Sequence, residues 1–318
     1  MVARPGRMAA SAAPLARSRR PPLLAASYRA GARVVRAFPP AFRHAVAAPG
    51  GAAWYWLNVR QRRAALENYG AALGLQPSDP AVARVARAAF QNYGRMVLDF
   101  LLMGSLSKDE LIQRTDADGI EHVDAALARG RGIIMALPHM GSWDNTGSYG
   151  GALGYPIVAV TGRFPGSLND AIVQTRERYG LQVLLVGRPA VREIIQALEA
   201  NRMVGLVCDQ EEGPGVEVSF FGRRAIVPGG PAALALKTGA ALIPGCQYMT
   251  PSGRHHIRLE AALSWPDGET KESLMQRIVN RFEAFIRERP EQWYAFRPIF
   301  KAASQVPPDR RASVLERG

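Results

Sequence analysis

The chain has 318 residues, of which 47% are hydrophobic and 21% are charged. This composition allows a sizeable core and excludes collagen-like, coiled-coil and wholly disordered chains. Its two cysteines, Cys208 and Cys246, cannot form a disulfide framework and lack the neighbours of a zinc site, so we expect no metal or other cofactor. The formal net charge is +13, which favours an anionic partner.

The positive charge is concentrated at the start of the chain. Twelve arginines precede the first acidic residue, Glu67, and the rest of the sequence is almost neutral. Such polarity fits either nucleic acid or anionic lipid. Residues 1–22 have no clear period and are expected to form a disordered basic leader, although an organellar transit peptide has a similar composition.

Residues 23–104 are expected to form a helical segment that faces a membrane. Its first part alternates apolar residues with arginines, and two tryptophans precede a second basic group; the residues singled out are Arg29, Arg33, Arg36, Trp54 and Trp56. Tryptophan beside arginine suits a bilayer interface, so we expect a peripheral contact with an anionic membrane surface. An amphipathic helix pair packed on the core is the alternative. Nucleic acid is disfavoured because no recognisable nucleic-acid-binding signature accompanies the arginines.

The later sequence predicts an α/β fold with a mostly parallel central sheet flanked by helices. Short apolar runs alternate with helical stretches from residue 105 onwards, which is the pattern of repeated strand–helix units. Helices are expected at 64–73, 80–103, 120–128, 141–153, 167–179, 190–200, 228–238 and 271–289, strands at 132–137, 156–160, 182–186, 203–208 and 240–244, and an edge strand within 255–265. We therefore expect an α/β domain over 105–305 and a disordered tail at 306–318.

A histidine and a carboxylate follow the first of these strands. His139 comes directly after the run Gly132–Leu137, and Asp144 follows it by five residues. The carboxyl ends of parallel strands are where ligands meet helix N-termini. A carboxylate that holds one ring nitrogen protonated would equip His139 to take a proton from a hydroxyl. A helix-capping aspartate beside an incidental histidine is the alternative.

The segment Pro138–Asp144 resembles the HxxxxD/E motif of the lysophospholipid acyltransferase-like superfamily. The similarity extends over roughly residues 25–300 and points to the bacterial branch of lipid A late acyltransferases and phosphatidylinositol mannoside acyltransferases. Further blocks that carry it are 162–163, 209–210, 215–222, 228–231, 238–240 and 290–294.

The resemblance implies transfer of a fatty acyl group from acyl-CoA or acyl carrier protein to a hydroxyl of a glycolipid or phospholipid. It implies a peripheral protein on the cytoplasmic face of the cytoplasmic membrane. His139 would be the general base and Asp144 its orienting partner, with Glu217 as another carboxylate able to stand behind the histidine. Arg163 would hold an anionic group of donor or acceptor, unless it forms a surface ion pair.

Other residues are expected around the same site. Trp143 within the motif and Asp209 after the strand 203–208 are expected to contact substrate. Glu211 and Glu212 follow on the same rim, where solvation alone explains acidic residues well.

Two departures from the pattern bear on the acceptor. Ser142 stands where asparagine is commoner in the family, and the motif ends in Asp144 where many lipid A enzymes have glutamate. The segment Ala295–Pro298 lacks the His-Arg-Arg run usual in those enzymes. These features favour the mannoside side of the family over a lipid A precursor.

Two other functions stay open at this stage. A lipid or thioester hydrolase shares the tetrahedral intermediate of acyl transfer, but the sequence has no Gly-x-Ser-x-Gly elbow, and Ser142 and Ser252 are poorly placed for one. A non-enzymatic membrane adaptor would explain the basic segment but would give no function to His139 and Asp144.

Overall fold

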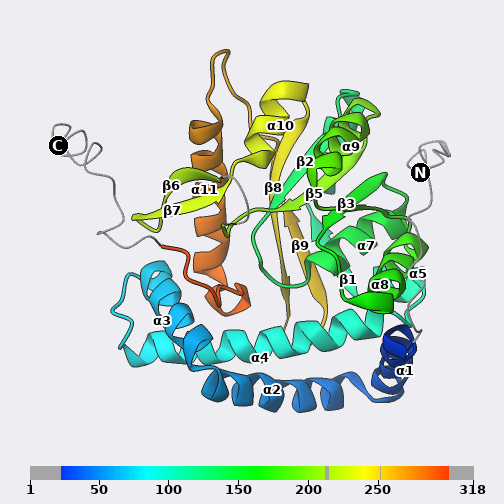
Figure 1. Ribbon diagram of the computed structural model, residues 1–318, viewed down its shortest axis with the longest axis vertical. Helices are drawn as coiled ribbons and strands as arrows, with labels where there is room; N and C mark the ends of the chain where they lie inside the picture. Colours follow the sequence, from blue (N-terminus) through cyan, green and yellow to red (C-terminus); the bar gives the residue numbers. More distant parts are fainter. Residues whose placement is uncertain (1–22, 212–214, 251, 301–318) are drawn as a thin grey trace.

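The computed structural model describes residues 23–211, 215–250 and 252–300 (Figure 1). The expected leader, Glu212 and the tail after Val306 lie outside these ranges. Within them the protein is an α/β fold around a mostly parallel sheet, as the sequence predicts.

The central sheet has seven strands in the order β1-β9-β8-β2-β5-β3-β4. The strands β8, β2, β5, β3 and β4 are parallel, whereas β9 runs antiparallel to β8 and carries β1 parallel to itself. Their bounds are β1 (Thr115–Asp118), β2 (Ile133–Leu137), β3 (Ile157–Thr161), β4 (Gln182–Leu185), β5 (Met203–Val207), β8 (Ala241–Met249) and β9 (His255–Leu259).

Helices cover both faces of the sheet because the strands are apolar on both sides. All five residues of β2 are buried. Ile134 and Ala136 belong to a core shared with α9, α10 and α11, whereas Ile133 and Met135 belong to a second core beneath α5 and α6. The helices of the α/β body are α5 (Lys108–Gln113), α6 (Ile120–Ala128), α7 (Trp143–Leu153), α8 (Gly166–Arg178), α9 (Arg188–Glu199), α10 (Gly230–Thr238) and α11 (Lys271–Glu288).

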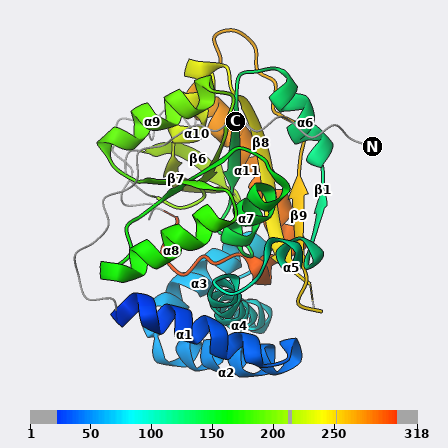
Figure 2. The ribbon, with the colours of Figure 1, turned by 90° about the vertical axis from the view of Figure 1, so that its right-hand side faces the viewer.

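Helices from the N-terminal segment lie across one end of the α/β body (Figures 1 and 2). They are α1 (Leu23–Ala37), α2 (Pro40–Leu57), α3 (Val59–Leu73) and α4 (Pro80–Met103). The helices α2 and α4 cross closely because glycines stand at the contact: a Cβ on Gly51 would come within 2.2 Å of the Phe90 carbonyl oxygen. The α4 N-terminus has the predicted cap, in which Asp79 accepts a hydrogen bond from the Ala81 amide (2.7 Å).

Several features differ from the sequence-based expectation, among them the additional short elements α5 and β1. Residues 215–228 form an antiparallel hairpin of β6 (Gly215–Phe220) and β7 (Arg223–Pro228), which pairs outside the main sheet. The edge strand expected within 255–265 is β9, which ends at Leu259. It is not an edge strand, because β1 pairs with it on the side away from β8. The third helix begins at Val59 rather than at residue 64.

Candidate active site

Two residues with titratable side chains, His139 and Asp209, follow neighbouring strands of the sheet. The strands β2 and β5 are parallel neighbours, and their last residues, Leu137 and Val207, are partners in the register. His139 and Asp209 each follow two residues later, so the chain carries both to the same level beyond the carboxyl edge of the sheet. The strand register therefore brings together residues 70 positions apart.

The histidine ring and the aspartate are hydrogen-bonded. Nδ1 of His139 lies 2.6 Å from Oδ1 of Asp209, and the His139 backbone amide donates to the same oxygen at 3.0 Å. The other carboxylate oxygen accepts a hydrogen bond from the Trp293 indole (2.7 Å). The Asp209 side chain is fully buried, whereas that of His139 is 24% exposed. The Asp209 carboxylate is therefore buried and held by hydrogen bonds, whereas the His139 ring is partly exposed to solvent.

The surroundings of Asp209 keep its carboxyl ionised. Burial by itself raises the pKa of this group, but the charge of His139 and the hydrogen bonds from His139 and Trp293 outweigh the burial and hold the pKa below its ordinary value. An ionised Asp209 accepts a hydrogen bond from Nδ1–H of His139 and so leaves Nε2 as the ring nitrogen for proton transfer.

The loop between β2 and α7 is fixed by backbone contacts. Tyr294 donates its amide to the His139 carbonyl (2.8 Å), and Gly141 donates to the Gln292 carbonyl (3.0 Å). Gly141 has φ of +60°, and a Cβ there would come within 2.1 Å of the Gln247 carbonyl oxygen. Only glycine fits this position, which the packing of β8 against the loop requires.

Asp144 binds an arginine. Its Oδ1 lies 2.8 Å from Nε and 2.7 Å from Nη2 of Arg176 on α8, in a pair of nearly buried side chains. The residue does lie in the first turn of α7, as expected. However, the carboxylate that hydrogen-bonds His139 Nδ1 is Asp209, for which the sequence predicts a substrate contact.

Glu217 lies on the hairpin. In β6 it occupies the outward face, while Val216 and Val218 point inward, and its carboxylate is paired with Arg224 across the hairpin. Glu217 was an alternative for the carboxylate that hydrogen-bonds the His139 ring, and Asp209 makes this hydrogen bond instead.

The other expected contacts surround the same edge. Trp143 packs edge-on against the His139 ring, with centroids 5.3 Å apart. Arg163 follows β3 and is exposed, and it forms no ion pair with any residue that the structure describes. Glu211 is exposed after β5.

The residues expected to meet a membrane divide into two groups. Trp56 is 57% exposed, and Arg33 is exposed on α1. Trp54 instead packs among Phe90, Tyr93 and Phe296. Two other arginines of α1 bind protein groups: Arg29 donates to Gln174 (3.1 Å) and Arg36 pairs with Glu110 (2.7 Å).

The sequence alone predicts no role for Trp293 or Arg176. Trp293 is fully buried and orients Asp209, but it follows α11 and is brought to the site only by the tertiary fold. Arg176 lies in the last turn of α8, where a basic residue is common for reasons of the helix dipole alone. The equal offset of His139 and Asp209 from their strands was the one local signal for the pair.

The fold and the geometry of the site define an α/β protein with a histidine–carboxylate pair at the carboxyl edge of its sheet. The sequence profile of the family described as bacterial lipid A biosynthesis acyltransferase matches residues 21–302. The chain belongs to this family and is an acyltransferase.

Individual relatives are similar over most of the chain. It is 32% identical to a phosphatidylinositol mannoside acyltransferase of Mycolicibacterium smegmatis over 295 residues, 90% of this chain and 93% of the relative. It is 31% identical to a protein of the same name from Mycobacterium tuberculosis over 302 residues, 92% of each chain. A lipid A biosynthesis acyltransferase of Haemophilus influenzae is 25% identical over 191 residues, 59% of each chain.

Proposed function

We propose that this acyltransferase moves a fatty acyl group from a thioester to a hydroxyl of a membrane glycolipid of the phosphatidylinositol mannoside class. The observation that carries the chemistry is the 2.6 Å contact between His139 and Asp209 at the carboxyl edge of the sheet. The acceptor class rests on the mannoside acyltransferases, which match over more than 90% of their length, whereas the lipid A relative matches over 59%. The donor is acyl-CoA or acyl carrier protein.

In the reaction, His139 acts as general base through Nε2. It takes the proton of the acceptor hydroxyl as the oxygen attacks the thioester carbonyl carbon, which gives a tetrahedral intermediate. The carbon–sulfur bond then breaks, and the imidazolium returns the proton to the departing thiolate. Asp209 holds the Nδ1 proton and stabilises the charged ring between the two steps.

Residues around the pair have supporting roles. We assign Asp144 to positioning, because its pair with Arg176 ties the start of α7 to α8 next to the motif. Trp143 forms one wall beside the imidazole. Arg163 is an exposed cation after a neighbouring strand and is assigned to an anionic group of donor or acceptor.

The membrane contact is assigned to a defined surface. Leu24, Val34, Phe38, Phe42 and Val46 are 42–58% exposed on α1, α2 and their connection, and we call them the α1–α2 apolar surface. None of the described helices is both long and apolar enough to cross a bilayer. These amphipathic helices would lie in the interface on the cytoplasmic face, with Arg33 beside lipid phosphate.

Transfer of a labelled acyl chain to an extracted mannoside lipid tests this function. We expect His139→Ala to lower kcat by about 10²–10⁴-fold, because it removes the base and leaves substrate binding. The thermal transition of the variant is the control for folding. Near-normal turnover by folded His139→Ala would contradict the mechanism.

A further inference from the structure

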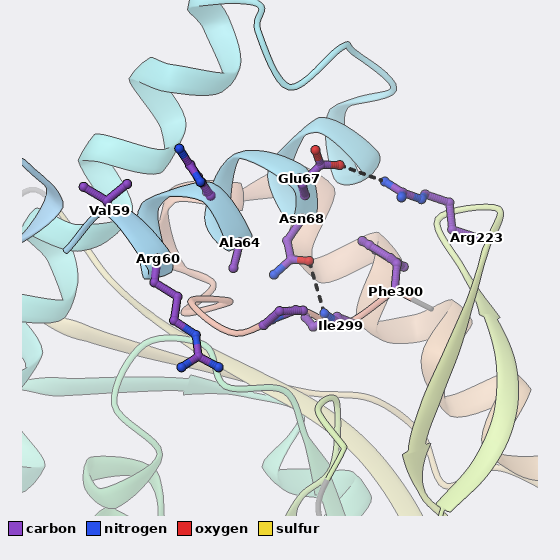
Figure 3. Close-up of a pocket in the computed structure, with 10 residues that line it drawn as sticks. Val59, Arg60, Ala64, Glu67, Asn68, Arg223, Ile299 and Phe300 are labelled. Carbon is purple, nitrogen blue, oxygen red and sulfur yellow. Dashed lines mark hydrogen bonds and ion pairs between the residues drawn. The ribbon is translucent and has the colours of Figure 1, made fainter. Parts of the chain in front are cut away.

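A separate cavity lies outside the region around His139. A cavity of about 600 Å³ opens between α3, the β6–β7 hairpin and the segment that follows η1 (Pro290–Gln292). Its size falls within the range of small-molecule sites. Figure 3 shows α3 and Arg223 on its rim. The lining residues are Val59, Arg60, Arg63, Ala64, Glu67, Asn68, Arg223, Pro298, Ile299 and Phe300.

The cavity carries an excess of positive charge. Three of its lining residues are arginines and one is a carboxylate. The carboxylate of Glu67 forms an ion pair with Arg223 at 3.8 Å. Arg60 and Arg63 form no ion pair with any residue between 23 and 300 that the structure describes. Two of the three arginines that line the cavity therefore have no anionic partner among the described residues.

The position of these arginines on α3 adds a second argument. Arg60 lies in the first turn of α3 and Arg63 follows one turn later, and that first turn has no acidic residue. The positive end of a helix dipole is unfavourable for cations. A bound anion would relieve both the mutual repulsion and the conflict with the dipole.

The surroundings indicate which anion fits. Guanidinium groups bind phosphate oxygens through paired hydrogen bonds. Beside the arginines, Trp56 and Leu57 at the end of α2 are 57% and 82% exposed, and Val59 on the cavity wall is 43% exposed. Exposed apolar residues next to cations are typical of a lipid headgroup boundary.

We propose that this cavity binds a phosphate group through Arg60, Arg63 and Arg223. The adjoining apolar residues favour a membrane lipid as its carrier, and identifying that lipid with the acceptor rests on the proposed function. The phosphates of CoA have the same chemistry and are the other source.

Calorimetric titration of the whole protein with glycerophosphoinositol and with CoA tests the site and names the source. We expect Arg60→Gln and Arg63→Gln each to weaken binding of the true ligand about tenfold, since each removes a charge-assisted hydrogen bond. High salt should weaken wild-type binding, and myo-inositol, which has no phosphate, should not bind. Arg192→Gln removes the same charge from the exposed part of α9 and should have no effect.

The proposal fails if neither phosphate probe binds at low salt, or if the Arg60→Gln/Arg63→Gln double variant binds both probes as the wild type does. These failures are separable from failure of the proposed function. A wild type that binds a probe in an arginine-dependent way but transfers no acyl group would overturn only the function. An active wild type without arginine-dependent binding would overturn only the site.

Discussion

The proposed reaction requires that Nδ1 of His139 is fixed by a hydrogen bond and that Nε2 is accessible to substrate. The two carboxylates considered for this hydrogen bond, Asp209 and Asp144, have different partners. Asp209 is fully buried against Nδ1, whereas Oδ1 of Asp144 binds Arg176. A carboxylate neutralised by a neighbouring guanidinium supports an imidazolium less than one whose partner is the ring itself. The contacts therefore separate an orienting carboxylate from one that fixes the fold of the loop.

Comparing Asp209→Asn with Asp144→Asn tests this division. We expect Asp209→Asn to lower kcat by roughly 10²–10⁴-fold, with little further loss when it is combined with His139→Ala, because the pair acts as a unit. Asp144→Asn should mainly destabilise the fold, by about 3–5 kcal/mol, because it leaves Arg176 buried without its carboxylate. The measurements are kcat per folded molecule and urea unfolding. The reverse pattern would return the orienting role to Asp144.

The acid stability of the protein depends on the same aspartate. Folding lowers the pKa of Asp209, while the unfolded chain has a value of about 3.9. The stabilisation is therefore complete above the unfolded pKa and is lost as the pH falls through the folded pKa. We expect the difference in unfolding free energy between wild type and Asp209→Asn to narrow as the pH falls from about 5 to about 3. A difference that stays constant over this range in urea titrations would contradict the assignment.

At the scale of elements, the sequence predicts those parts whose pattern is local. The strands β2 and β5 are continuous apolar runs, so their position and the edge beyond them follow from the sequence alone. The hairpin has an alternating signal in β6, where Val216, Val218 and Phe220 are buried. Its pairing with β7 is not among the sequence-based expectations.

Other elements have no local signal. The strand β1 reads Thr-Asp-Ala-Asp and exists because β9 offers it an edge to pair with. Likewise, nothing near Asp144 in the sequence indicates that Arg176, 32 residues later, will reach it. These contacts depend on how α7 and α8 pack, which only the assembled fold determines.

The α1–α2 apolar surface gives a prediction for its two helices. Phe38 and Phe42 stack with centroids 4.7 Å apart and are both more than 40% exposed. We expect Phe38→Ser/Phe42→Ser to weaken flotation with anionic liposomes at least tenfold, because inserting a large apolar side chain contributes about 1.5–3 kcal/mol. Flotation should also decrease in high salt.

The matched control removes exposed apolar residues elsewhere. Val186 and Val191 are 67% and 55% exposed near the start of α9, and Val186→Ser/Val191→Ser should float as the wild type does. Equal flotation of both double variants would exclude the α1–α2 apolar surface as the contact.

Across the molecule, the segment after η1 joins the N-terminal helices to the carboxyl edge of the sheet, where His139 and Asp209 lie. Trp293 donates to Asp209, while its own carbonyl accepts a hydrogen bond from the Tyr69 hydroxyl of α3. Asn68 of α3 donates to the carbonyls of Ala295 (2.9 Å) and Arg297 (2.7 Å). One hydrophobic core includes residues of α3, α4, the sheet and α11.

This shared core predicts that residues 23–104 and the α/β body unfold together, although the sequence suggested a boundary near residue 105. Tyr69→Phe tests the link, because it keeps the ring against Trp293 and leaves the buried Trp293 carbonyl without its partner. We expect a loss of about 1–3 kcal/mol in the free energy of unfolding and a single transition in which tryptophan fluorescence and far-ultraviolet circular dichroism coincide. Because Trp293 also orients Asp209, kcat should decrease at temperatures where the variant remains folded. Two separate transitions, or a destabilised variant with unchanged kcat, would show that the N-terminal helices are a separate unit and do not support the site.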